Sequence, residues 1–260
     1  MENYNLPGFN IFDGHAHYDD DAFKDDLSEV ITSIKENGVI GVINAGIDYS
    51  SSETLIALSK KYDIFYTAVG VHPENLYPDK SLDTEKMQSL INCNKVVAIG
   101  EIGLDYHWNL FDPEIQKKWF VDQIDFANSV CLPVIVHDRD AHFDTMNILK
   151  QTKPKGIIHC FSGSAEMAAE ALKLGLYIGV GGVVTFKNAK KSVEVVKTVP
   201  INRIIFETDA PYLSPQPQRG KRCRSDYIYY TAAKVAEIKG MPTDEVLKAS
   251  RENIKELYGI

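Results

Sequence analysis

The sequence lacks long apolar runs, paired cysteines and an excess of basic charge. No apolar run reaches the roughly 18 residues that a membrane-spanning helix needs, and the N-terminal residues do not combine a basic segment with an apolar one as a signal peptide does. The four cysteines form no Cys-X-X-Cys pair, which argues against a zinc ribbon and a thioredoxin-like redox motif. We therefore expect a soluble, cytoplasmic protein that has no membrane association and no evident obligate protein partner.

The charge balance is acidic, with 28 Lys and Arg against 36 Asp and Glu and a net charge of −8. The sequence therefore has no general basic footprint for nucleic acid. A local basic patch or bound metal ions can still hold a phosphate backbone, because counterion release depends on the contact surface and not on the total charge. Composition leaves the partner open, while 44% hydrophobic residues favour a folded globular protein over a disordered or fibrous one.

Eight short runs of apolar and β-branched residues alternate with segments of helical periodicity. The runs span residues 9–12, 39–44, 64–69, 95–99, 133–136, 156–158, 176–180 and 203–206. A chain of 260 residues accommodates eight such strand–helix units. We therefore predict an α/β fold of one closed (β/α)₈ TIM barrel, with residues 1–260 as a single domain. A doubly wound open sheet is the alternative fold.

The reactive side chains fall directly after these runs, where a barrel collects its chemistry. His15 and His17 follow the first run and point to the same side, because side chains alternate along an extended backbone. A lone His-X-His pair is weak evidence of a metal site, but further candidates follow later runs. These candidates are Glu101, His137, His159 and Asp209.

Glu101 is the natural bridge between two cations, because a carboxylate has two oxygens whereas a neutral imidazole offers one lone pair. The other candidates are divided between the two ions: His15, His17 and Asp209 for one, His137 and His159 for the second. Water held between the ions would lose its proton near neutral pH, and Asp209 is the candidate proton acceptor. The predicted reaction class is metal-assisted hydrolysis.

Five motifs carry a family resemblance. They are DGHAH at 13–17, GEIGLDY at 100–106, HCFSG at 159–163, ETDAPYL at 207–213 and RGKR at 219–222. Together they resemble the TatD family of metal-dependent deoxyribonucleases, a branch of the amidohydrolase-like barrels. The match runs from residue 11 to the C-terminal helical segment, with the motifs in the right order.

The resemblance implies a TIM barrel that hydrolyses DNA phosphodiesters, commonly as a 3′–5′ exonuclease on single-stranded DNA or 3′ ends. It carries over the same six ligands and adds His72, which would contact substrate or order water. It also suggests activity with Mg²⁺, whereas four imidazoles favour Zn²⁺ or Mn²⁺ by ligand type. The expected cofactors are therefore two divalent ions, Mg²⁺, Mn²⁺ or Zn²⁺.

A basic run after the last strand is the main candidate for phosphate binding. It contains Arg219, Lys221 and Arg222, and Arg139 after the fifth strand is a further candidate. Such cations can hold a nucleic-acid backbone without reading its bases. This rim also departs from the family pattern: many members have histidine, histidine and asparagine at the positions of Glu74, Gln218 and Cys223. Strand or end preference could therefore differ from the family's.

Two further positions near the expected metals have predicted roles. Tyr106, with His107 and Trp108 after it, can stack on an unpaired base or simply pack the loop. Glu207 lies two residues before Asp209 and so points to the same side, where it can order a ligand histidine or a water.

Three other functions remain open at this level. A small-molecule amidohydrolase acting on a cyclic amide, ester or phosphotriester would use a similar rim, although the glutamate after the fourth strand and the basic loop disfavour it. A non-catalytic nucleic-acid or protein adaptor would not need six metal-compatible side chains. An editing hydrolase acting on aminoacyl-tRNA is the third and weakest alternative.

Overall fold

The computed structural model describes residues 9–108 and 110–260. Eight parallel strands form one sheet in sequence order, and Ala16 also pairs with Ala210, just beyond the last strand. The strands therefore make a nearly closed barrel, as predicted. They are β1 (Ile11–Ala16), β2 (Val39–Ala45), β3 (Phe65–Val69), β4 (Val96–Asp105), β5 (Val134–Arg139), β6 (Gly156–Ile158), β7 (Tyr177–Val180) and β8 (Ile204–Phe206).

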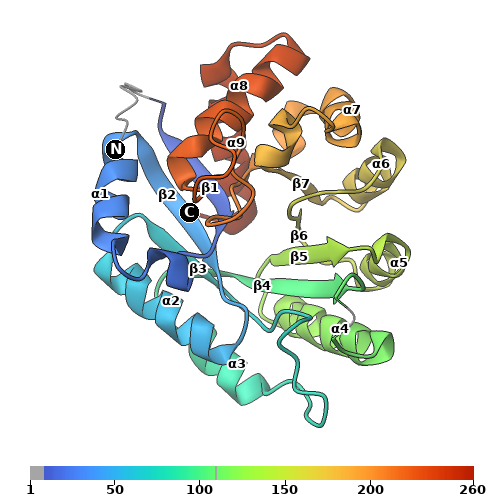
Figure 1. Cartoon of the computed structure of the whole chain (residues 1–260). Helices are drawn as coiled ribbons and strands as arrows, with labels where there is room; N and C mark the ends of the chain where they lie inside the picture. The colour runs from blue at the N-terminus through green and yellow to red at the C-terminus, as the bar shows by residue number, and fades with distance from the viewer. Residues whose placement is uncertain (1–8, 109) are drawn as a thin grey trace.

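Helices alternate with the strands and surround the sheet (Figure 1). The α-helices are α1 (Leu27–Glu36), α2 (Tyr49–Lys61), α3 (Thr84–Ile91), α4 (Pro113–Ser129), α5 (His142–Thr152), α6 (Ala165–Lys173), α7 (Lys190–Thr198), α8 (Ile228–Lys239) and α9 (Thr243–Tyr258). The 3₁₀ helices are η1 (Asp21–Phe23), η2 (Gly182–Thr185), η3 (Ile201–Arg203) and η4 (Ser225–Tyr227). Across the described ranges, no helix is both long and apolar enough to span a bilayer.

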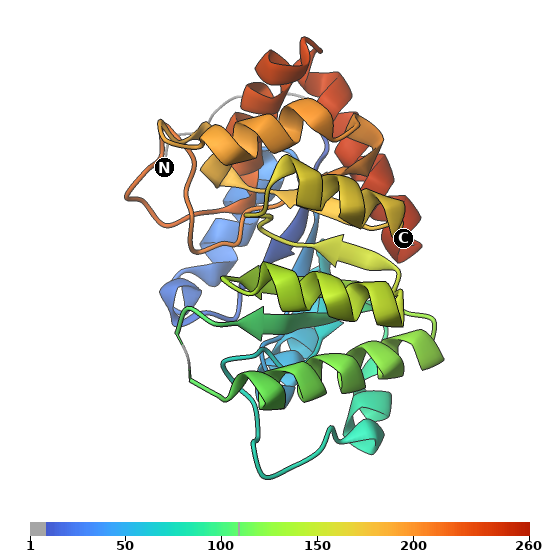
Figure 2. The same cartoon turned by 90° about the vertical axis from the view of Figure 1, so that its right-hand side faces the viewer.

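The carboxyl ends of the strands share one rim, because all eight strands are parallel. Figure 2 shows the strand arrowheads and the long loop after β8 on the same side of the molecule. Three strands run further than their apolar runs indicated, so His15, Glu101 and His137 lie within strands and not after them. The apolar pattern underestimated these strands because β4 and β5 stay paired as far as Asp105 and Arg139, where the side chains are polar.

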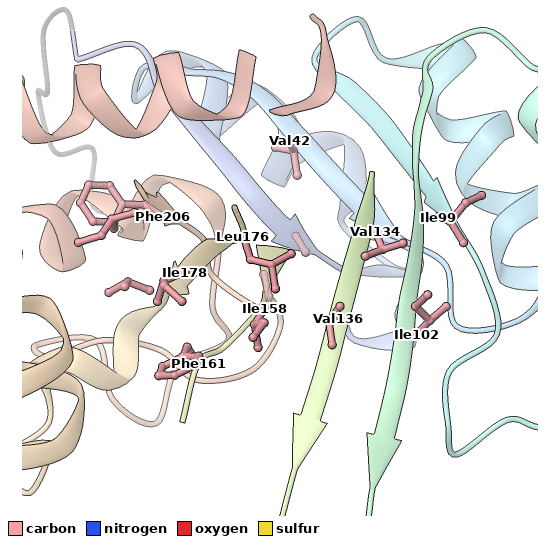
Figure 3. Close-up of a cluster of buried hydrophobic side chains, with 14 of the residues drawn as sticks. Val42, Ile99, Ile102, Val134, Val136, Ile158, Phe161, Leu176, Ile178 and Phe206 are labelled. Carbon is pink, nitrogen blue, oxygen red and sulfur yellow. The ribbon is translucent and has the colours of Figure 1, made fainter. Parts of the chain in front are cut away.

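Hydrophobic side chains form separate clusters inside and outside the barrel. The outer cluster fills the space between sheet and helices, and Figure 3 shows Val134, Val136 and Ile158 among its members. The inner cluster draws on every strand and on the last turns of α9: Phe12, Ile43, Ala68, Val97, Ala98, Ile135, Ile157, Tyr177, Ile205, Ile254, Leu257 and Tyr258. Burial on both faces explains why the strands read as continuous apolar runs and not as alternating ones.

The inner cluster lies directly below the polar side chains of the rim, inside the barrel. Ile135 and Ile157 belong to this cluster, and His137 and His159 lie two residues further on, within β5 and directly after β6. Because side chains two residues apart share a face of a strand, these histidines continue the inner face toward the rim. The alternation of side chains along the strands therefore places apolar residues in the barrel interior and the polar residues that follow them at the rim.

Candidate metal centre

Glu101 lies at the centre of the rim and is almost completely buried. Its Oε2 lies 3.4 Å from Nε2 of both His15 and His17. Its Oε1 lies 2.7 Å from Nδ1 of His137 and 2.8 Å from Nε2 of His159. The two carboxylate oxygens thus face different ring nitrogens, which is the arrangement that a carboxylate shared by two cations requires.

Asp209 completes the group around His15 and His17. Its Oδ1 lies 3.6 Å from Nε2 of His15 and 3.4 Å from Nε2 of His17. Asp209 has a φ of 59°, a left-handed conformation that costs a non-glycine residue about 1–3 kcal/mol. The amides of Thr208 and Asp209 both donate to the His15 carbonyl, which helps to hold this conformation.

Hydrogen bonds orient two of the histidine rings. Nδ1 of His17 donates to the Ala45 carbonyl at 2.9 Å, and Nε2 of His137 donates to Oδ2 of Asp105 at 3.0 Å. A ring nitrogen that donates its proton in this way leaves the lone pair of the other nitrogen for a metal. His17 therefore presents Nε2 and His137 presents Nδ1 to Glu101.

Asp105 is a site residue that the sequence analysis did not assign. Its carboxylate accepts the proton of His137 and also the backbone amides of His107 and Trp108. Burial alone would raise the pKa of Asp105, but these hydrogen bonds lower it to about 2. The overlooked signal was its position four residues after Glu101, which puts both carboxylates on the same face of extended backbone.

Glu207 is buried near His159, and its Oε1 is 3.8 Å from Nδ1 of that ring. The same oxygen accepts a hydrogen bond from the amide of Cys160. Burial raises the pKa of Glu207 to about 8. The structure thus brings Glu207 next to a predicted ligand histidine, although at 3.8 Å the contact exceeds hydrogen-bonding distance.

Protons and metal ions compete for the same ring nitrogens. Burial alone would lower the pKa of His137, but its hydrogen bond to Asp105 and its contact with Glu101 raise it to about 10. Burial is opposed in the same way at His17, whose pKa lies well above 6.5 because of nearby carboxylates. At His15, burial prevails and lowers the pKa to about 4. Metal affinity should therefore rise with pH.

His72, which was predicted to contact substrate or order water, lies in direct contact with the candidate metal ligands. Its Nε2 lies 3.4 Å from Oε1 of Glu101, and its ring meets His137 edge-on at 4.4 Å between centroids. Among residues 9–108 and 110–260, the candidate ligand atoms form three groups, each within 4.8 Å: His15, His159 and Asp209; His15, His17 and Glu101; His72, Glu101 and His137. This set of imidazoles and carboxylates fits divalent metal ions.

Comparison with known proteins decides the family. The family model described as TatD related DNase matches residues 12–259. The chain belongs to this family. Similar proteins include the uncharacterized metal-dependent hydrolase YabD of Bacillus subtilis (strain 168), which is 43% identical over 253 residues and is matched over 96% of this chain and 99% of its own.

Solved structures agree with this membership. The TatD homolog YjjV of Escherichia coli superposes with a TM-score of 0.88 at 30% identity, covering 96% of this chain and 98% of that chain. A TatD-family hydrolase of Entamoeba histolytica gives 0.81 at 25% identity, with the same coverages. This TatD-family chain is therefore a metal-dependent hydrolase whose candidate metal site is the cluster around Glu101.

Aromatic side chains on the rim of this TatD-family hydrolase differ in their exposure. The hydroxyl of Tyr106 donates to Asp144 of α5 at 2.8 Å, and its ring is half-buried. Trp108 is exposed, and the guanidinium carbon of Arg139 lies 5.3 Å from its ring centroid. Packing of the loop therefore accounts for the position of Tyr106, whereas Trp108 presents its ring to solvent.

The basic residues after β8 also differ in their contacts. Arg219 and Lys221 are exposed, and the Arg219 guanidinium lies over the ring of Phe186 at 4.2 Å. Arg222 donates from both terminal nitrogens to the carboxylate of Asp26, at 2.8 and 2.6 Å. The ion pair gives Arg222 a structural contact in addition to its predicted contact with phosphate.

Proposed function

We propose that this hydrolase cleaves phosphodiester bonds of DNA as a 3′–5′ exonuclease, with two divalent ions bound at the rim of the barrel. The observation that carries the proposal is that the two carboxylate oxygens of Glu101 face different sets of histidine nitrogens, two at Oε2 and three at Oε1. Support for DNA as the substrate comes from the description of the family as a DNase. Bound ions would lower the pKa of a water molecule and offset the charge that develops on the phosphoryl group.

The proposed division of the ligands follows the contacts that the two oxygens of Glu101 make with the histidines. Glu101 would be shared, with His15, His17 and Asp209 on its Oε2 side and His137 and His159 on its Oε1 side. His72 would order substrate or water beside Oε1. With these ligands, the substrate phosphate would bind at the mouth of the barrel.

Asp209 is proposed to accept the proton of the attacking water. Burial alone would raise its pKa, but the contact with His17 lowers it, so Asp209 is a carboxylate at neutral pH. Its Oδ1 lies 3.6 Å from Nε2 of His15 and 3.4 Å from Nε2 of His17. A water molecule bound next to these nitrogens would therefore lie within reach of the Asp209 carboxylate, which could accept its proton.

Phosphates on either side of the cleaved bond would meet the basic residues of the rim. Arg139, Arg219 and Lys221 are exposed there and are proposed to bind the backbone. Arg222 would contribute to the same positive surface while its bond to Asp26 holds the loop.

The test is the release of labelled nucleotide from 3′-labelled single-stranded DNA by the metal-reconstituted protein. We expect release by the wild-type protein and none with Asp209→Asn or with EDTA. Asp138→Asn is a matched control, because Asp138 is a carboxylate of β5 that bonds His142 and makes no contact with Glu101 among the described interactions. No cleavage by folded, metal-loaded protein would overturn the proposal and favour a small-molecule amidohydrolase.

A further inference from the structure

Exposed hydrophobic side chains gather on the rim that carries the candidate metal centre. Among the described residues, Trp108 and Leu110 in the β4–α4 loop are 55% and 59% exposed, and Phe143 in the first turn of α5 is 78% exposed. Tyr212, after β8, is also exposed, whereas Ile40 lies at the start of β2, at the opposite end of the barrel. Exposed apolar groups concentrated beside a functional site mark a surface that a ligand covers.

The backbone of Trp108 is tied to the candidate metal centre by one carboxylate. Asp105 accepts the Nε2 proton of His137 with one oxygen and the amides of His107 and Trp108 with the other, at 3.0, 2.9 and 3.1 Å. His107 is held in addition by Asp140, at 3.0 Å. The exposed indole therefore extends from a backbone whose position is fixed relative to the ligand cluster.

Arg139 completes a surface of mixed character. It pairs with Asp105 in the β4–β5 register, and its guanidinium lies over one face of the Trp108 indole, with its carbon 5.3 Å from the ring centroid. The carboxylates nearby already have partners: Asp105 is bonded as described, Asp140 bonds His107, and Asp144 bonds Tyr106 and Lys117. A flat aromatic ring beside an exposed cation matches the base and the phosphate of one nucleotide.

We infer that Trp108 is a stacking platform for an unpaired nucleobase and that Arg139 binds the phosphate next to that base. The inference rests on the proposed function and deepens it, because it names the residues that would hold the terminal base and the phosphate beside it. The terminal base of a single strand can turn its flat face to the indole without breaking a base pair.

Fluorescence tests the platform without turnover. The chain has two tryptophans, and Trp119 is buried, so a change in exposed tryptophan emission reports on Trp108. Adding a hydrolysis-resistant phosphorothioate single strand to metal-loaded protein should quench this emission. Trp108→Phe should abolish the quenching and leave the Trp119 signal unchanged. Unquenched emission in the wild type, at strand concentrations that inhibit cleavage, would overturn the inference.

Kinetics give the second test. Trp108→Ala should raise KM and lower kcat/KM for a single strand about tenfold, with little change for the same strand lacking bases on its last two nucleotides. Trp108→Phe should keep most of the activity, and Ile40→Ala is the matched control for loss of an exposed apolar side chain. Equal losses on both strands would overturn the stacking role. Absence of any cleavage by wild-type protein would instead refute the proposed function, while the fluorescence result still decides the platform.

Discussion

The ligand cluster and the basic loop after β8 share one rim but are held in different ways. Glu101 is buried, and it contacts histidines from β1, β5 and the end of β6 within 3.4 Å. In the basic loop, Arg219 lies over Phe186, and Arg222 bonds Asp26 from the segment before α1. The candidate metal ligands are thus positioned by the strands of the sheet, whereas the basic residues proposed to bind substrate are positioned by contacts between a loop and distant parts of the chain.

Replacing Glu101 should have the largest effect, because one side chain serves both halves of the cluster. Glu101→Ala should lose bound metal and lower kcat/KM by at least about a thousandfold, as expected for groups that act as a unit. Metal content by mass spectrometry and nucleotide release measure the two effects. Full activity in Glu101→Ala would refute the shared-ligand assignment and with it the contrast between cluster and loop.

Asp105→Asn probes the support behind the cluster and should have an intermediate effect. The carboxylate fixes which nitrogen of His137 carries the proton, and removing such a hydrogen-bond partner typically costs about 10–100-fold in metal affinity or activity. Metal titration at constant pH measures this change. Asp138 follows His137 on β5, but its carboxylate bonds His142. Asp138→Asn should therefore leave metal affinity unchanged. Equal losses in both variants would show a general effect on β5 and contradict the orienting role.

The ligand cluster could be predicted from the sequence because the directions of side chains along a strand follow a regular period. Alternation along extended backbone predicts that His15 and His17 share a side, and a parallel barrel brings all strand ends to one rim. The structure places every one of the six predicted ligands within 3.6 Å of another. Asp105 was missed because its role depends on the ring orientation of His137, which residue spacing does not specify.

The loop contacts were less accessible, because their partners are far away in the chain. Arg222 and Asp26 are separated by 196 positions, and no periodic pattern links a loop after β8 to the segment before α1. Tyr106 shows the same limitation, since its hydroxyl bonds Asp144 on α5, 38 positions further along the chain. Composition identified the basic run but not the partner of each cation.

The basic loop predicts a smaller, salt-dependent effect. Lys221→Ala combined with Arg222→Ala should raise KM several-fold with metals retained, and should reduce the slope of log(kcat/KM) against log[salt] by about 1 for each phosphate that the variant no longer neutralises. The single variants sharpen the comparison, because Arg222 also bonds Asp26. If the salt slope stays unchanged in the double variant, the loop does not bind phosphate.

The smallest effect should come from Asp26→Asn, which removes the partner of Arg222 but leaves the positive charge in place. A half-exposed ion pair stabilises a protein by no more than about 1 kcal/mol, so the free energy of unfolding in urea at pH 7 should fall by at most that amount. Asp25→Asn, an exposed neighbour with no salt bridge among the described interactions, is the control.

The pH dependence of this pair follows from the pKa of Asp26, which its hydrogen bond with Arg222 lowers below the usual value. A lowered native pKa means that the unfolded chain binds the proton more readily, so the stabilisation is present above the unfolded pKa near 4. It is lost as the pH falls through the native pKa, and wild type and Asp26→Asn should converge there. A stability difference that persists or grows in acid would show that Asp26 acts through something other than its charge, and that the loop is held more like the cluster than the comparison allows.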